Sequence, residues 1–188
     1  MMSMMVHCVL PLNGYGVVLS GREESVLFFD LDYKFDFKRF VELLKNRIGR
    51  NCRQQGVDLG EREFLDIVRS SLSRFNLCRC VDQLEFGVSL KALSSRPTIP
   101  YKSIFIDSLD CYFWQERTMR SRRGGYPINT LLTLLKRLQR EKEANIIMTV
   151  SEFFNSSGPT LFLSNQTLKI GDKTIPFQID PTEGLIPN

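Results

Sequence analysis

Acidic side chains end two of the apolar runs in this sequence. Asp107 closes the run Ser103–Asp107, and Asp30 and Asp32 lie at and just beyond the end of the run Val26–Asp30. In sheets that hydrolyse nucleotides, an aspartate in such a place (the Walker B form) holds the water shell of Mg²⁺, and a second acidic group can orient the attacking water. Aspartate also stabilises the turns that follow strands. The residues therefore leave two alternatives open, a nucleotide and magnesium site or simple turn formation.

The motif that would complete a nucleotide site does not occur in these residues. No G-x-x-x-x-G-K-[ST] sequence is found anywhere in the 188 positions. This loop supplies the backbone N–H groups and the lysine that hold the phosphates. We therefore expect no efficient ATP hydrolysis and no cofactor. ATP and Mg²⁺ would enter only with a missing N-terminal segment that carries the loop.

The strongest charge cluster is a basic, glycine-containing stretch at residues 117–125. It follows the aromatic triplet 112–114 and contains four arginines, which are Arg117, Arg120, Arg122 and Arg123. Arginines beside aromatic rings suit single-stranded nucleic acid, because the cations meet phosphates and the rings stack on bases. The alternatives are a solvated surface loop and an aromatic patch that belongs to the core or faces a partner. We keep the four arginines as a candidate DNA-binding site.

The cysteine and histidine content argues against a metal site and against nucleophilic catalysis. The chain has five Cys, no C-x-x-C pair and a single His, His7. An odd number of cysteines without such a pair fits reduced thiols rather than a disulfide framework or a zinc site. Cys78 and Cys80 lie two residues apart on an expected strand, so they share a face. We interpret both as small buried hydrophobic residues and expect no metal.

Length and composition predict one globular domain. The 188 residues are 43% hydrophobic and 24% charged, with 25 Lys and Arg against 21 Asp and Glu, a formal charge of +4. This composition excludes a disordered acidic or polar chain. No apolar run approaches the roughly 18 residues that span a membrane, and we expect no secretory signal. The mild basic excess is compatible with nucleic acid.

Strand-like and helix-like patterns alternate along the chain. Strand patterns occupy residues 26–30, 75–81, 103–107 and 145–150. The apolar runs at 26–30 and 103–107 are typical of strands buried on both faces. Amphipathic stretches predict helices at 1–10, 36–49, 64–72, 82–93 and 127–138. Glycines mark a loop over residues 14–21. Asp36 is expected to cap the second helix and Gly49 to end it, with a loop over 50–60.

This alternation predicts an α/β layered domain with a mainly parallel central sheet. The tail changes to short strand patterns at 161–163, 167–170 and 175–179, with Gly171 and Asp172 as a tight hairpin turn. We expect this tail to add antiparallel strands at one edge of the sheet. Ligands of such sheets gather at the carboxyl ends of the strands. Polar residues there are Asp30, Asp32, Asp107, Ser108, Thr149, Ser151 and Glu152.

Five stretches occur in the order and with the spacing of a known family. They are HCVLP (7–11), SVLFFDLDYKFDFKRFVELLKNRI (25–48), RFNLCRC (74–80), SIFIDSLDCYFW (103–114) and NIIMTVSE (145–152). In them the chain resembles the RecA-type recombinases and, more narrowly, the eukaryotic recombinase paralogues, over about residues 4–152. The stretches DLDYKFD and IDSLDCYFW together carry the narrower resemblance, and the segment after residue 155 matches only loosely.

The resemblance implies a RecA-like three-layer fold and one ATPase-core domain over residues 1–188. This domain would be truncated at its N-terminus, since the chain begins just beyond the family's phosphate loop. The resemblance also places Asp107 at the Walker B aspartate, Asp32 at or next to the water-activating acid, and Ser151 where many recombinases carry a glutamine that senses the γ-phosphate. These three residues would form a vestigial nucleotide and magnesium site. Residues 117–125 fall at the family's first DNA-binding loop, and 153–159 at a shortened second loop.

The same resemblance implies a non-catalytic subunit in homologous-recombination repair of DNA double-strand breaks. Such a subunit would act in the nucleus, through complexes with other recombinase paralogues, especially the D-type paralogue, and with single-stranded or branched DNA. No membrane partner is expected. A partner would cover the sheet edge that is left unpaired without the phosphate-loop strand. The alternative is a DNA-dependent ATPase whose phosphate-loop segment is missing from this sequence.

Overall fold

The computed structural model places two compact units, and each is described by itself. The backbone is described for residues 1–112, 128–150, 161–164, 167–170, 173–180 and 184–187, and side chains are described no further than residue 150. One unit comprises Met1–Arg22, Asp36–Ser71 and Glu152–Asn188; the other comprises Glu23–Phe35 and Leu72–Ser151. That the whole chain forms a single RecA-like domain stays a prediction.

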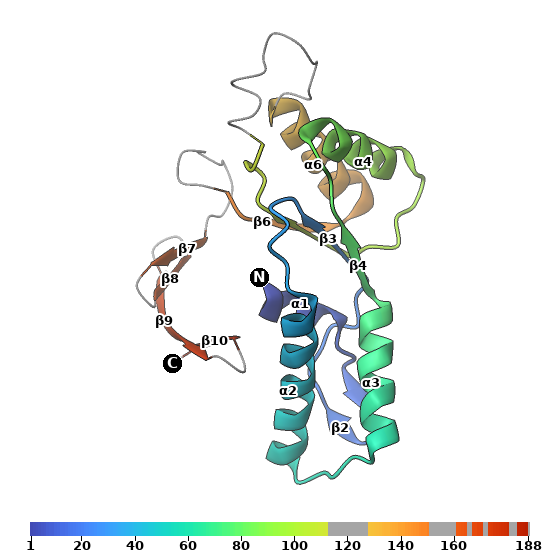
Figure 1. The fold of residues 1–188 in the computed structure, drawn as a ribbon, viewed down its shortest axis with the longest axis vertical. Helices are drawn as coiled ribbons and strands as arrows, with labels where there is room; N and C mark the ends of the chain where they lie inside the picture. Colours follow the sequence, from blue (N-terminus) through green and yellow to red (C-terminus); the bar gives the residue numbers. More distant parts are fainter. Residues whose placement is uncertain (113–127, 151–160, 165–166, 171–172, 181–183, 188) are drawn as a thin grey trace. The chain divides into compact units, whose positions relative to one another are not determined.

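The second unit is built on a parallel sheet of four strands in the order β4-β3-β5-β6 (Figure 1). The strands are β3 (Val26–Asp30), β4 (Phe75–Cys78), β5 (Ser103–Asp107) and β6 (Asn145–Met148). All three pairings are parallel. The inner strand β3 is buried at every position, as its continuous apolar run predicts. The predicted α/β class with a mainly parallel sheet is confirmed, and the arrangement is consistent with a RecA-like fold.

Two helices cover this sheet and close its core. Helix α4 (Gln83–Ser95) begins at Asp82, whose carboxylate accepts a hydrogen bond from the Glu85 N–H at 2.8 Å. Figure 1 shows α4 beside α6 (Ile128–Lys142). Apolar side chains of both helices pack on those of the sheet, and the fully buried ones include Phe29, Phe86, Leu90, Ile104, Ile106, Leu131 and Leu138. This core holds the strands whose carboxyl ends carry the candidate site.

The cysteines are all free thiols. Cys80 is fully buried in the core of the second unit, which confirms the prediction for that residue, whereas Cys78 at the end of β4 is only half-buried. A hydrogen bond between the two thiols lowers the pKa of Cys78 to about 7 and, together with burial, raises the pKa of Cys80. The two thiols are therefore in contact, but β4 ends at Cys78 and is shorter than the predicted strand 75–81, so that Cys80 lies beyond it and the two residues differ in environment.

The first unit combines three helices with a hairpin that the sequence analysis did not predict. The helices are α1 (Met2–Val9), α2 (Phe37–Gln55) and α3 (Glu61–Ser73), whose last residues belong to the second unit. Strands β1 (Asn13–Gly14) and β2 (Val17–Val18) pair within the expected glycine loop. The turn places both Tyr15 and Gly16 at positive φ, 49° and 81°, as tight two-residue hairpins require. No helix in the described residues is long and apolar enough to cross a membrane.

Helix α2 extends beyond the predicted end at Gly49, so this prediction was wrong. Its start is as predicted, since the Asp36 carboxylate accepts a hydrogen bond from the Arg39 N–H at 3.1 Å. It ends at Gln55, and Gly56 follows at φ 64°, in the left-handed conformation of a helix C-cap. Buried Cys52 continues the apolar stripe of Ile48 by one turn. Of the loop predicted over 50–60, residues 50–55 therefore belong to the helix, whereas residues 56–60 form the connection to α3.

Because Gly49 lies inside a helix, Gly49→Ala is expected to stabilise the protein by about 0.5–1 kcal/mol. A Cβ there would meet only the Nη1 atom of Arg53, at 3.7 Å, which is ordinary contact. The opposite sign is expected for Gly56→Ala, because its φ of 64° strains an L side chain. Urea unfolding followed by circular dichroism measures both changes. Destabilisation by Gly49→Ala would contradict the uninterrupted helix.

The C-terminal strands form a sheet of their own. They are β7 (Leu161–Ser164), β8 (Thr167–Ile170), β9 (Lys173–Asp180) and β10 (Gly184–Pro187), paired antiparallel in the order β10-β9-β8-β7. Antiparallel pairing is as predicted, and Ile170 pairs with Lys173. The predicted turn residues Gly171 and Asp172 lie outside the described residues. The expected pairing with an edge of the parallel sheet does not occur among the described strands. Short connections bring consecutive strands together, so each finds its partner in the next.

Candidate functional site

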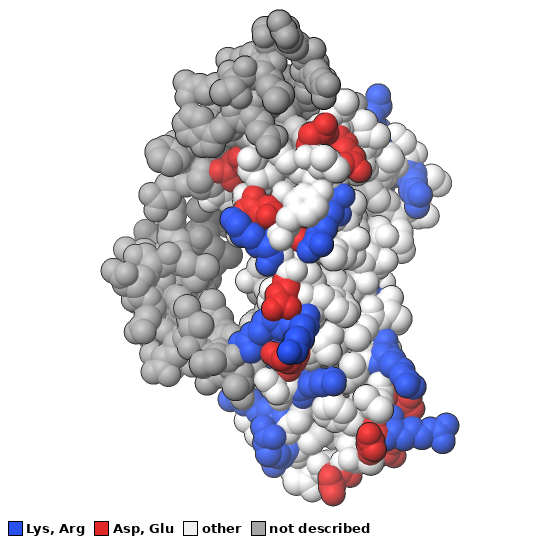
Figure 2. All heavy atoms as spheres, viewed as in Figure 1, with Lys and Arg blue, Asp and Glu red and all other residues white. Residues whose placement is uncertain are grey.

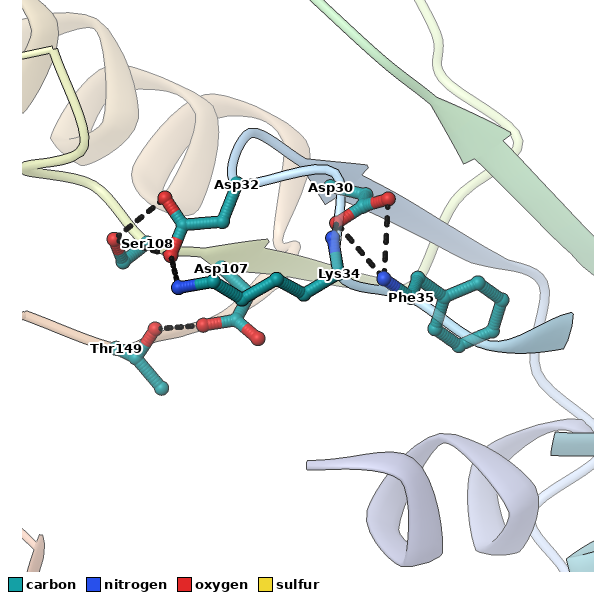
Figure 3. Close-up of polar contacts among 7 residues, drawn as sticks. All are labelled: Asp30, Asp32, Lys34, Phe35, Asp107, Ser108 and Thr149. Atoms are coloured by element: carbon teal, nitrogen blue, oxygen red, sulfur yellow. Dashed lines mark hydrogen bonds and ion pairs between the residues drawn. The ribbon is translucent and has the colours of Figure 1, made fainter. Parts of the chain in front are cut away.

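The carboxyl ends of β3, β5 and β6 bring the predicted acidic residues together. Asp30 and Asp107 are directly opposite each other in the register of β3 and β5. The backbone oxygen of Asp107 accepts hydrogen bonds from the N–H groups of Leu31 at 2.8 Å and Asp32 at 3.3 Å. The loop that follows β3 is therefore fastened to the end of β5, and Figure 3 shows the side chains that gather there.

Asp107 lies half-buried at the end of β5 and is held by the next strand. The Thr149 hydroxyl, just beyond β6, donates a hydrogen bond to Oδ1 of Asp107 (Figure 3). The Thr149 backbone is fixed in turn, because its N–H donates to the Ile106 oxygen and its own oxygen accepts from the Leu109 N–H, both at 3.0 Å. Parallel strand order thus brings Thr149 to Asp107, two of the polar residues that the sequence places at the strand ends.

Asp32 is engaged by a hydroxyl and by a cation. The Ser108 Oγ lies 3.4 Å from each carboxylate oxygen of Asp32, and the Lys34 ammonium lies 3.1 Å from Oδ2. The hydrogen bond and the charge of Asp32 raise the pKa of Lys34, and the charge of Asp107 adds to this effect. Lys34 therefore stays positively charged beside Asp32. Burial and the nearby Asp32 charge also raise the pKa of the Cys111 thiol to about 12, which keeps it neutral.

Asp30 has a structural role that fixes the loop carrying Asp32. Its side chain is 2% exposed and accepts hydrogen bonds from the N–H groups of Lys34 at 3.0 Å and Phe35 at 3.3 Å. Nε of Arg79 forms an ion pair with the same carboxylate at 2.8 Å. The turn-forming alternative for Asp30 is thus the one that the structure supports.

Arg79 was missed by the sequence analysis, although a signal for it existed. It follows β4, the parallel neighbour of β3, so it emerges at the same edge of the sheet. Besides Asp30 it bonds the Phe35 oxygen at 3.4 Å, and its guanidinium lies over the Tyr33 ring, 5.4 Å from the centroid. The signal in the sequence is an arginine just beyond a strand, but its pairing with Asp30 follows only once β4 is known to lie beside β3. Arg79 and Asp30 together hold both ends of the loop.

The remaining predicted site residues lie outside the described residues. These are Ser151 and the four arginines Arg117, Arg120, Arg122 and Arg123. Of the aromatic triplet, only Tyr112 is described: it is buried, and its hydroxyl donates a hydrogen bond to the Cys80 oxygen. Burial raises its pKa. The core alternative is therefore confirmed for Tyr112.

The arrangement combines two carboxylates, two hydroxyl groups and one ammonium at the carboxyl edge of a parallel sheet. Asp32 and Asp107 could hold the water shell of a divalent cation, with Ser108 and Thr149 beside them. Among the described residues no group of three or more His, Cys, Asp and Glu side chains is placed to bind a metal directly. The chemistry that these groups offer is charge neutralisation and hydrogen bonding to a polar ligand.

Comparison with known proteins gives relatives whose names describe DNA repair. No protein-family model matches the chain. The DNA repair protein XRCC2 homolog of Arabidopsis thaliana is 26% identical over 140 residues, which are 62% of this chain and 38% of that protein. The DNA repair protein XRCC2 of Mus musculus is 25% identical over 138 residues, which are 71% of this chain and 43% of that protein. The chain is thus similar to both of these DNA repair proteins over most of its length.

This similarity confirms the predicted resemblance to a recombinase paralogue of the DNA repair machinery. The chain spans less than half the length of either of these two XRCC2 proteins, 38% and 43%. The matched portion is most of this chain, 62% and 71%.

Proposed function

We propose that this chain serves as a non-catalytic recombinase-paralogue subunit in homologous-recombination repair of DNA double-strand breaks. The observation that carries the proposal is the similarity to two proteins named as DNA repair protein XRCC2 or its homolog. Its site of action would be the nucleus. The mild basic charge of +4 supports work close to DNA.

A role without ATP turnover is supported by the chemistry of the carboxyl edge. The 188 residues contain no phosphate-binding G-x-x-x-x-G-K-[ST] loop. The carboxylate of Asp32 is already neutralised by Lys34, and that of Asp107 accepts a hydrogen bond from Thr149. These contacts satisfy the two acids within the chain. Asp107, Asp32 and Ser151 are accordingly proposed as a vestigial nucleotide and magnesium site.

Partners are proposed from the resemblance to the recombinase paralogues, with the D-type paralogue first among them. In the described sheet, β6 has a neighbour only on the β5 side, and β4 only on the β3 side. An edge strand offers unpaired N–H and C=O groups to a further strand. A paralogue that adds such a strand would complete the sheet and bury the edge.

A second candidate function is a DNA-dependent ATPase formed by a longer protein that includes these residues. The observation that favours it is geometric: Asp107 ends β5, and Asp32 is hydrogen-bonded to Ser108, the residue directly after Asp107. Under this alternative, Asp107→Asn would abolish turnover of a longer form. Turnover of ATP by the purified 188-residue chain would overturn the non-catalytic proposal.

DNA binding by the basic stretch gives the proposal its direct test. Changing Arg117, Arg120, Arg122 and Arg123 together to Ala is expected to weaken binding to single-stranded DNA and to reduce its salt dependence. Each phosphate contact contributes about 0.7 to the slope of log K against log salt for single strands, so four lost contacts lower the slope by up to about 3. Fluorescence anisotropy on a labelled oligonucleotide over a salt series measures this slope.

The matched control removes the same charge elsewhere. Lys38, Arg62, Lys136 and Arg140 are exposed on the described helices, and their joint change to Ala is expected to alter the slope far less. Asp107→Asn is expected to leave binding unchanged, because a vestigial site contributes no phosphate contact. An identical slope for both quadruple variants would remove the arginine stretch from the DNA-binding surface.

A further inference from the structure

Helix α4 is apolar on two opposite faces. Its inner face carries Phe86 and Leu90, which are fully buried in the core with α6. Leu84 and Val88 lie on the outer face and are 46% and 51% exposed, and Val81, just before the helix, is 75% exposed. Spacings of three and four residues put these side chains on one line. A helix with two apolar faces usually packs against other parts of a protein on both of them.

The outward line continues along the whole helix. Ala92 is exposed one turn beyond Val88, so that the outer stripe, as we name it, consists of Val81, Leu84, Val88 and Ala92. A helix of 13 residues is about 20 Å long, and the stripe runs from end to end of it. From Leu84 through Val88 to Ala92 its side chains become smaller toward the C-terminus. Such a stripe fits another helix that lies along it.

Charges beside the stripe determine which helix fits. Exposed Asp82 and Glu85 lie at the beginning of α4, and exposed Lys91 and Arg96 lie near its end. Figure 2 shows acidic side chains over the start of α4 and basic side chains beyond its end. A partner helix must therefore place positive charge at the first end and negative charge at the second. The helix α4 of another copy does this when it runs antiparallel.

We infer that the outer stripe of α4 binds the outer stripe of a second copy of this chain, antiparallel and about a two-fold axis at Val88. In this pairing each Val88 meets its counterpart, Leu84 faces the small Ala92 of the other copy, and Glu85 faces the other Lys91. A two-fold axis repeats every contact, so each pair occurs twice. In this arrangement a large side chain packs against a small one, and each charged end of the stripe lies beside an end of opposite charge on the other copy.

The size of the stripe determines the strength of this association. One helix pair buries less than the roughly 1,200 Å² of a stable interface, so a dissociation constant of roughly 10–100 µM is expected. The association would be concentration-dependent and compatible with exchange for another amphipathic helix of the same charge order. The inference goes beyond the proposed function and does not depend on it.

Cysteine cross-linking tests the axis directly. Val88→Cys is expected to give a disulfide-linked dimer under mild oxidation, because the two introduced thiols face each other. Thr133→Cys, exposed on α6, is the matched control, and the unchanged chain shows what its own cysteines contribute. Mass spectrometry of the linked peptides identifies the bond. Cross-linking of Val88→Cys at the level of Thr133→Cys would overturn the inference.

A charge exchange tests the direction of the helices. Lys91→Glu places acids at both ends of the stripe and is expected to weaken dimerisation about tenfold, since two exposed pairs turn repulsive. Adding Glu85→Lys to it restores opposite signs and should recover most of the affinity. Val88→Asp should leave a monomer in sedimentation equilibrium. A chain that is monomeric throughout the accessible concentrations, or a dimer that survives Val88→Asp, would refute the proposal.

Discussion

Gly21→Ala is expected to lower the free energy of unfolding by about 3 kcal/mol or more. A Cβ at Gly21 would lie 2.1 Å from the carbonyl oxygen of Leu10 and 2.4 Å from its carbonyl carbon. Both are backbone atoms, so no change of side-chain rotamer relieves the clash. The two segments are also tied by hydrogen bonds from the Gly21 N–H to the Pro11 oxygen and from the Arg22 N–H to the His7 oxygen, each at 3.1 Å. The substitution must therefore separate them.

A glycine in an open position provides the control. At Gly60 a Cβ would meet only Oε2 of Glu63, at 3.6 Å, and Gly60→Ala is expected to stay within about 0.5 kcal/mol of the parent. Urea unfolding followed by far-ultraviolet circular dichroism gives both values. If Gly21→Ala unfolds at the same urea concentration as Gly60→Ala, the close approach of Gly21 to Leu10 is not a feature of the folded protein.

The contrast between these glycines also explains what the sequence could predict about the fold. Strands β3 and β5 were predictable because an apolar run buried on both faces is a local pattern. The contact of Gly21 with Leu10 joins segments eleven residues apart along the chain, and no local pattern encodes it. The end of α2 was misplaced for a related reason: Gly49 breaks a helix only if the chain can turn there, and buried Cys52 favours one more turn.

At the candidate site, composition and strand ends predicted the acids but not their partners. Asp32 and Asp107 could be named because both follow apolar runs and parallel strands end at one edge. The role of Arg79 depends on β4 lying next to β3, a strand order that the sequence does not state. Lys34 was overlooked because its importance comes from the turn that brings its ammonium back to Asp32. The roles of Ser151 and the four arginines stay predictions.

Asp30→Asn is expected to lower the free energy of unfolding by about 3 kcal/mol. The carboxylate is 2% exposed and serves three donors, namely the N–H groups of Lys34 and Phe35 and Nε of Arg79. An amide of the same size keeps one acceptor oxygen and turns an NH₂ group toward donors. The Arg79 side chain is 42% exposed, so water can hydrogen-bond to its guanidinium when the Asp30 carboxylate is lost. The expected loss of stability is therefore at the lower end of the range for breaking a buried ion pair.

The loss of stability in Asp30→Asn should result mainly from the burial of the carboxylate and less from the ion pair itself. A second ion pair in the chain distinguishes these two causes. Arg137 and Glu141 form an ion pair with the same Nε–oxygen distance, 2.8 Å, but both side chains are about half exposed. Glu141→Gln is therefore expected to cost less than about 0.5 kcal/mol. Arg79→Met combined with Asp30→Asn should cost less than the sum of the single changes, because both break the same contact.

Hydrogen exchange shows whether the Asp30 carboxylate also holds the loop that carries Asp32. Its N–H partners Lys34 and Phe35 should lose protection in Asp30→Asn well before the sheet does, since their acceptor is weakened while β3 and β5 remain paired. Glu141→Gln should leave these amides unchanged. Equal protection of Lys34 and Phe35 in both variants would show that Asp32 is positioned by its bonds to Ser108 and Asp107 alone. A selective loss would show that the buried Asp30 sets the geometry of the loop that carries the half-buried Asp32.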